Sequence, residues 1–222
     1  MTSTTTKALR IYAGPAALAQ IQQHGRLAPD MVRVIPAAAG GPKGLILGPL
    51  DRFIFGEWLP QSTQSVHLIG GSIGAWRMAT ACLSDAVGAF ERLEHDYIHQ
   101  QYEIAPGAKR PTAEHVSARF ADNLKQFFGG QIGTLLAHPR YRLHVVTSHG
   151  RGLLAREGRL ATPLGYLGAY ASNALSRRSL AHWLERVVFS SSTDGAMAPL
   201  PFDADDFRTL QVALDERNFM PA

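Results

Sequence analysis

The sequence contains a single cysteine, Cys82, in 222 residues. One cysteine excludes an internal disulfide and a zinc site built from cysteines alone. No apolar run reaches the roughly 20 residues that a helix needs to cross a bilayer. The first ten residues also lack the basic segment and apolar core of a secretory signal. These absences predict a cytoplasmic protein of a bacterium-like cell.

The overall composition is typical of a globular protein. Hydrophobic residues make up 45% of the chain and charged residues 18%, a balance that allows a sizeable core. A length of 222 residues fits one domain of generous size. We therefore expect a single domain over residues 1–222, with the oligomeric state left open.

Arginine is concentrated in one part of the chain. Residues 140–186 hold eight arginines against two acids, whereas residues 194–222 hold six acids against two arginines. A basic face of this kind is typical of contact with anionic headgroups or nucleic acid, and equally of a solvated surface with local ion pairs. Of these partners we expect a peripheral membrane contact and no nucleic acid.

Strand-like and helix-like segments alternate along the chain. Apolar, β-rich runs predict strands at residues 31–36, 65–69, 140–147, 186–190 and 207–214. Helical spacing of apolar residues predicts helices at 15–24, 45–59, 73–83, 85–102, 112–129, 131–138 and 163–184, and a last helix that begins at residue 216. Residues 191–206 are expected to be a loop. This alternation predicts an α/β fold around a largely parallel sheet flanked by helices.

A Gly-x-Ser-x-Gly motif follows the strand expected at residues 65–69. A serine in a strand-to-helix turn of this kind is a nucleophile elbow, which holds the hydroxyl clear of the sheet. Gly70 and Gly74 flank Ser72 where side chains would collide, and Gly71 lets the turn approach its neighbours. Ser72 is thus the candidate nucleophile. The simpler alternative is a tight turn that packs a helix on a strand.

A second glycine-rich turn lies 31 positions before Ser72 and also joins a strand to a helix. It contains Gly40, Gly41, Lys43 and Gly44, with a proline at position 42. Turns at the ends of successive parallel strands meet at one edge of a sheet. Backbone N–H groups of such a loop can hold the oxyanion that forms when a serine attacks an acyl carbonyl. A phosphate-binding P-loop is disfavoured because no Gly-Lys-Ser/Thr follows.

Together, the Gly-Gly-Pro-Lys-Gly and Gly-x-Ser-x-Gly turns resemble the patatin-like phospholipase family, most closely over residues 34–79. The resemblance implies a three-layer patatin-like fold and hydrolysis of lipid acyl esters, of the phospholipase A or lipid esterase type. It implies Ser72 as nucleophile, an oxyanion and substrate site at Gly40, Gly41, Lys43 and Gly44, and no metal or cofactor. The family's loop usually begins with a further glycine, where this chain has an alanine at position 39.

In that family, an aspartate of an Asp-Gly-Gly/Ala motif completes a Ser–Asp dyad. The one Asp-Gly-Ala in this chain begins at Asp194. Its surroundings differ from the family pattern, in which the motif follows a helix with small residues, serine and proline, and residues 218–222 resemble the approach to such a helix. Two expectations therefore stay open: either Asp194 is the base, or the chain stops before the catalytic aspartate.

Several histidines offer alternative chemistry. His95 and His99 lie four residues apart on one helix face with Asp96 between them, as in some zinc sites, but no third ligand is evident and a metal site is not expected. His67 lies on the strand that precedes the Ser72 turn and is expected to be structural.

Two other functions remain possible for this fold. An α/β-hydrolase with a Ser-His-Asp triad would need His149 or His182 as its base. A catalytically silent binding or scaffold protein would need no base at all. In the preferred interpretation, the apolar helices within residues 83–128 form an acyl pocket or a lid.

Overall fold

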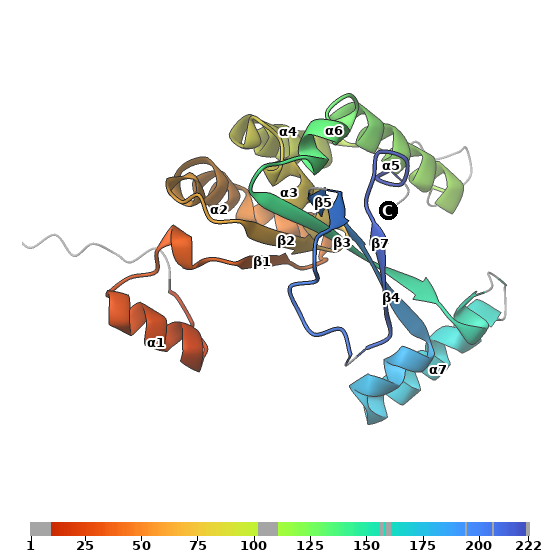
Figure 1. The fold of residues 1–222 in the computed structure, drawn as a ribbon. Helices are drawn as coiled ribbons and strands as arrows, with labels where there is room; N and C mark the ends of the chain where they lie inside the picture. The colour runs from red at the N-terminus through yellow and green to blue at the C-terminus, as the bar shows by residue number, and fades with distance from the viewer. Residues whose placement is uncertain are drawn as a thin grey trace, which may run out of the picture.

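The structure is a computed structural model that describes residues 10–101, 111–155, 158, 161–193, 195–205 and 207–220. Its centre is a five-stranded sheet in the order β1-β2-β3-β4-β7 (Figure 1). The strands are β1 (Val34–Ala37), β2 (Val66–Gly70), β3 (Tyr141–Gly150), β4 (Leu184–Ser190) and β7 (Thr209–Ala213). A separate two-stranded hairpin, β5 (Ser192–Thr193) and β6 (Ala196–Met197), lies within the segment expected to be a loop.

The sheet is mostly parallel, as predicted. β1 pairs with β2, β2 with β3, and β4 with β7 in parallel, whereas β3 and β4 are antiparallel. The register aligns Ala37 with Gly70 and Gly70 with Val145. The carboxyl ends of β1 and β2 therefore lie at one edge of the sheet, next to the second half of β3.

Helices lie on both sides of this sheet, which confirms the α/β layering. Figure 1 shows α2 to α6 together above the sheet, and α1 and α7 below it. The helices are α1 (Pro15–His24), α2 (Gly48–Phe53), α3 (Ile73–Ala81), α4 (Ala86–His99), α5 (Ala113–Phe128), α6 (Ile132–Leu136) and α7 (Ala161–Leu175). None of the helices among the described residues is both long enough and apolar enough to span a membrane.

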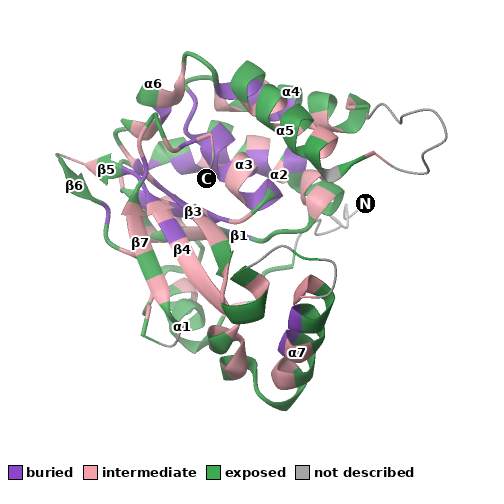
Figure 2. Ribbon diagram, turned by 90° about the vertical axis from the view of Figure 1, so that its right-hand side faces the viewer, coloured by how far each residue is buried: buried purple, intermediate pink, exposed green. Residues whose placement is uncertain are grey.

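The main core lies between the sheet and the upper helices. Burial alternates along β2, so Val66 and Leu68 face this core. They are joined there by Met78 of α3, Phe90 of α4 and Leu143 of β3. Figure 2 shows the buried residues gathered in α3 and the central strands, while α7 is largely exposed.

Two predicted helices differ from the structure. The helix expected at residues 45–59 is divided into a 3-10 helix (Gly41–Leu47), α2, a π-helical turn (Ile54–Trp58) and a second 3-10 helix (Leu59–Gln61). Pro49 explains the first break, because its nitrogen cannot donate a helical hydrogen bond and it favours the first turn of a new helix. Residues 216–220 form turns instead of the expected helix.

A chain of polar side chains crosses the lower face of the sheet. His67 Nδ1 lies 2.9 Å from His144 Nε2, and His144 Nδ1 lies 2.8 Å from Ser190 Oγ. The amide of Gln211 donates to Ser190 Oγ at 2.9 Å. A consistent assignment has Ser190 donate to His144, and His144 donate to His67, with both imidazoles neutral. The expectation that His67 is structural fits this role.

Burial and the neighbouring His67 lower the pKa of His144 to about 4, so acid is expected to destabilise the fold. The unfolded chain takes up a proton near pH 6.5, whereas the folded chain does so only near pH 4, so stability is lost as pH falls between these values. The shift corresponds to a loss of about 3 kcal/mol at most. Urea unfolding at pH 7, 5.5 and 4.5 measures it.

A His144→Gln variant, which cannot titrate, should show a flatter dependence on pH. His138→Gln is the comparison variant. Burial and two arginines lower the pKa of His138 to about 4 as well. An unchanged slope in His144→Gln would refute the assignment to His144.

Candidate active site

The geometry at Ser72 is unusual for a residue with a side chain. Ser72 stands between β2 and α3 with φ 54° and ψ −130°, and it is the one non-glycine residue with positive φ in the described part of the chain. Such a conformation costs about 1–3 kcal/mol, and residues that adopt it cluster at active sites, ligand clamps and switch regions. The residue is exposed. Among the described residues, its Oγ has no hydrogen-bond partner.

The flanking glycines allow this turn to close. A Cβ on Gly70 would lie 2.4 Å from the carbonyl carbon of Gly74, and a Cβ on Gly74 would lie 2.2 Å from the carbonyl oxygen of Ala37. At Gly71, the nearest atom would be the Val146 carbonyl oxygen at 3.3 Å. Strand β2, helix α3 and strand β1 thus approach one another more closely than any side chain permits.

A Gly74→Ala substitution should therefore be strongly destabilising. The clashing atoms belong to the backbone of Ala37 and of position 38, which cannot rotate away as a side chain would. Forced overpacking of this kind typically costs about 1–3 kcal/mol, and we expect the upper end or beyond. Thermal unfolding measures the loss. Gly14→Ala, where a Cβ would meet open space at a negative φ of −66°, is the control for an added methyl group without a clash.

The glycine loop lies directly beside the nucleophile turn. It follows β1 and begins the 3-10 helix at Gly41, whose φ is 56°. A Cβ on Gly44 would lie 2.9 Å from Cγ2 of Ile73, the first residue of α3. The structure therefore brings Gly40, Gly41 and Gly44 to the same edge as Ser72. The Lys43 side chain is exposed there.

A tyrosine near this loop was missed by the sequence reasoning. The hydroxyl of Tyr97, on α4, lies 4.0 Å from the position of a Cβ on Gly41. Tyr97 lies between His95 and His99 in the sequence, where the two histidines suggested a metal motif and the tyrosine itself carried no separate signal. The two histidines are exposed and stack on each other at 4.2 Å. Among the described residues, no three histidine, cysteine or acidic side chains come together in a group that could hold a metal ion.

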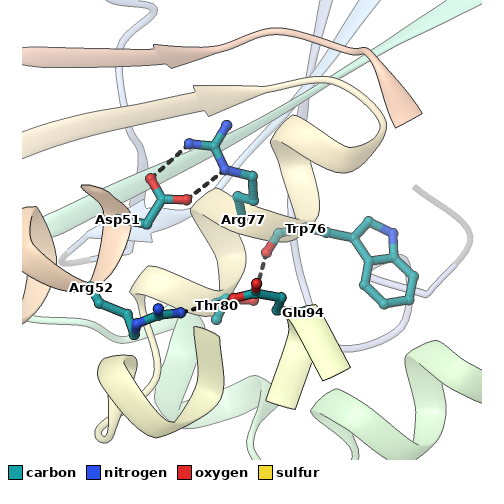
Figure 3. Close-up of polar contacts among 6 residues, drawn as sticks. All are labelled: Asp51, Arg52, Trp76, Arg77, Thr80 and Glu94. Carbon is teal, nitrogen blue, oxygen red and sulfur yellow. Dashed lines mark hydrogen bonds and ion pairs between the residues drawn. The ribbon is translucent and has the colours of Figure 1, made fainter. Parts of the chain in front are cut away.

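A buried ion pair joins the two helices that follow the loops. Arg77 of α3 donates from Nε to Asp51 Oδ2 at 2.6 Å and from Nη2 to Oδ1 at 2.7 Å (Figure 3). Both side chains are buried. Arg77 Cδ also lies 3.7 Å from the position of a Cβ on Gly44. The pair thus fixes α2, which continues the glycine loop, against α3, which carries Ser72.

A small apolar pocket opens beside the serine. It has a volume of about 140 Å³. Its walls come from α3, α5, β3 and the segment after β7, and are formed by Ser72, Ala75, Trp76, Ala79, Leu124, Phe128, Val145, Val146, Thr147, Phe219 and Met220. Helix α5 lies within the segment expected to supply an acyl pocket, and the pocket uses it together with residues far apart in the sequence.

The three candidate bases belong to other segments of the chain. Asp194 lies outside the described residues. The chain before it leaves the sheet after β4, where the Ser191 amide donates to the Leu143 carbonyl. Because β4 is antiparallel to β3, its last residue, Ser190, pairs with His144, one position from the Val145 that pairs with Gly70 at the end of β2. Of the alternative bases, His149 lies 3.9 Å from Glu185 and the exposed His182 bonds to its own helix.

Comparison of the chain with protein-family models, with curated proteins and with solved structures gives no match. The functional argument therefore depends on the geometry of the site itself.

Proposed function

We propose that the protein is a serine acyl hydrolase with a patatin-like fold, acting on lipid acyl esters or small ester surrogates. The observation that carries the proposal is the strained backbone of Ser72 at the junction of β2 and α3. A tight turn without function has no need of a serine there, because glycine adopts this conformation at no steric cost. The glycine loop packed against α3 adds the second part of an acyl-transfer site.

In the proposed reaction, the Ser72 hydroxyl attacks the acyl carbonyl. A base removes its proton, and the amides of Gly40, Gly41 and Lys43 are the candidate donors to the oxyanion. Collapse of the tetrahedral intermediate passes a proton to the alcohol, which leaves, and an acyl-serine remains. Water then attacks the acyl-serine with the same base, which releases the carboxylic acid and restores the hydroxyl. Asp194 is the candidate base, and neither metal nor cofactor is needed.

A fluorophosphonate probe tests the proposal. It should form an adduct on the peptide that contains Ser72, because only an activated serine reacts. Asp194→Asn, compared with Asp203→Asn, tests the dyad, and His149→Gln and His182→Gln test a Ser-His-Asp triad. Rapid labelling elsewhere in the chain would contradict the assignment.

A catalytically silent scaffold is the second candidate function. It is favoured by one observation, that Ser72 Oγ has no hydrogen-bond partner among the described residues. A folded protein that hydrolyses no ester and gives no adduct would support the scaffold.

We also propose that the protein is cytoplasmic and contacts an anionic membrane surface through α7. Leu164, Leu167 and Tyr170 of this helix are 58%, 63% and 74% exposed. Arg177 and Arg178 follow at its end, and residues 158–184 contain no acid. Exposed apolar residues beside arginines suit the interface of a bilayer with anionic headgroups.

Vesicle sedimentation tests this contact. Binding to vesicles with phosphatidylglycerol should exceed binding to phosphatidylcholine alone and should fall with salt. Replacement of both Arg177 and Arg178 by alanine should weaken it by about thirtyfold, at about 1 kcal/mol for each arginine. Arg217→Ala, which removes an exposed arginine outside α7, is the matched control. Equal binding to both kinds of vesicle would contradict the charge argument.

A further inference from the structure

The pocket beside Ser72 is lined by large rings. Phe128 is fully buried, and its ring lies 5.3 Å from that of Phe219 and 6.0 Å from that of Trp76. Ala75 and Ala79 of α3 form the adjoining wall. Apart from Ser72 and Thr147, every lining residue is apolar or aromatic. The pocket therefore suits a hydrocarbon chain whose carbonyl is held at Ser72.

The size of this pocket limits the chain that it can hold. Its volume of about 140 Å³ is close to that of an apolar cavity of about 150 Å³ that binds one benzene molecule. Six carbons are thus about the upper limit for a fully buried acyl group. A longer chain would leave its remaining methylenes outside the pocket.

The neighbouring groove has a more polar lining than the pocket. This larger space, of about 680 Å³ between α4 and α5, shares Trp76 with the pocket. Its lining is mixed: Leu93, Phe120 and Phe127 lie among polar side chains that include Arg92, Asp96, Asn123 and Gln126. An acyl chain laid along the groove would remove these polar side chains from water without hydrogen bonds in return. The groove instead suits the polar alcohol portion of a substrate.

We propose, as a narrowing of the proposed function on which it rests, that the enzyme is selective for esters of short acyl chains, of about two to six carbons. The acyl group occupies the pocket, and the polar alcohol lies toward the groove on the other side of Trp76.

A series of p-nitrophenyl esters with acyl chains of 2, 4, 6, 8 and 12 carbons tests the inference on the full chain. The value of kcat/KM should be highest at four to six carbons and at least tenfold lower at twelve. Leu124→Ala, which enlarges the pocket, should shift the optimum to longer chains. Ala75→Leu, which fills it, should reduce turnover of the hexanoyl ester more than that of the acetyl ester. Leu210→Ala, on the exposed face of β7, should change neither.

The outcomes separate the two proposals. If Ser72 is labelled by the fluorophosphonate probe but twelve-carbon esters are the best substrates, the chain-length inference is wrong and the hydrolase remains. An optimum that does not move in either pocket variant, with both variants folded, also overturns it. If no ester is cleaved and Ser72 is not labelled, the proposed function fails first.

Discussion

Replacement of Ser72 by glycine is expected to remove ester hydrolysis and, at the same time, to stabilise the protein. Loss of the hydroxyl removes the nucleophile, and turnover should fall on the order of 10³-fold or more. Glycine adopts φ 54° and ψ −130° without the steric cost that serine carries there, so relief of strain should outweigh the greater entropy of the unfolded chain. The expected gain is about 1 kcal/mol, or about 2–4 °C in Tm.

Ser72→Ala provides the matched control. Alanine also lacks the hydroxyl and should be equally inactive, but it keeps the Cβ and therefore the strain. Calorimetry and ester hydrolysis on the three proteins measure both effects. If both Ser72→Gly and Ser72→Ala have the Tm of the parent protein, Ser72 is not strained in solution. The main support for its role as nucleophile is then lost.

Asp51→Ala is expected to have the largest effect on stability. It leaves the guanidinium of Arg77 buried without its carboxylate, and removal of one partner of a buried ion pair costs about 3–5 kcal/mol. That loss is a large part of the roughly 5–15 kcal/mol that stabilises a typical domain. Urea unfolding measures it.

The double variant Asp51→Leu with Arg77→Met tests the pair itself. With both charges removed and similar volumes kept, stability should lie well above that of Asp51→Ala, since no unpaired charge remains buried. Arg52→Met, which breaks the half-buried contact of Arg52 with Glu94 at 2.9 Å, should cost about 1 kcal/mol or less. A double variant as unstable as the single one would show that shape, and not charge, holds α2 on α3.

Local signals in the sequence predicted most of the fold. Helix α1 covers the predicted residues 15–24, with a proline in its first turn and a left-handed glycine directly after it. Asp85 and Thr112 cap α4 and α5 through their side chains, as their positions suggested. The mostly parallel sheet followed from the alternation of strands and helices. Each of these features depends on residues within a few positions of one another.

The site was only partly predictable, because its walls come from distant segments. The two glycine turns carry their own local patterns and could be found directly. The pocket, by contrast, unites α3 with Leu124, Val145 and Phe219, and no periodicity links these positions. The contact of Asp51 with Arg77 likewise depends on how α2 packs on α3. The antiparallel direction of β4 was also beyond reach, since a run of β-rich residues has no direction.

The long connection between β2 and β3 has a consequence for synthesis. Gly70 pairs with Val145, 75 positions later, so β3 is translated roughly 4–15 s after β2 at about 5–20 residues per second. During that interval the edge of β2 that will pair with β3 has no partner. Its unpaired backbone groups and apolar side chains favour pairing with any other strand nearby. Newly made chains are therefore exposed to one another before the fold can protect them. The yield of active protein in a cell should depend on chaperone supply and synthesis rate more than on the stability of the finished molecule.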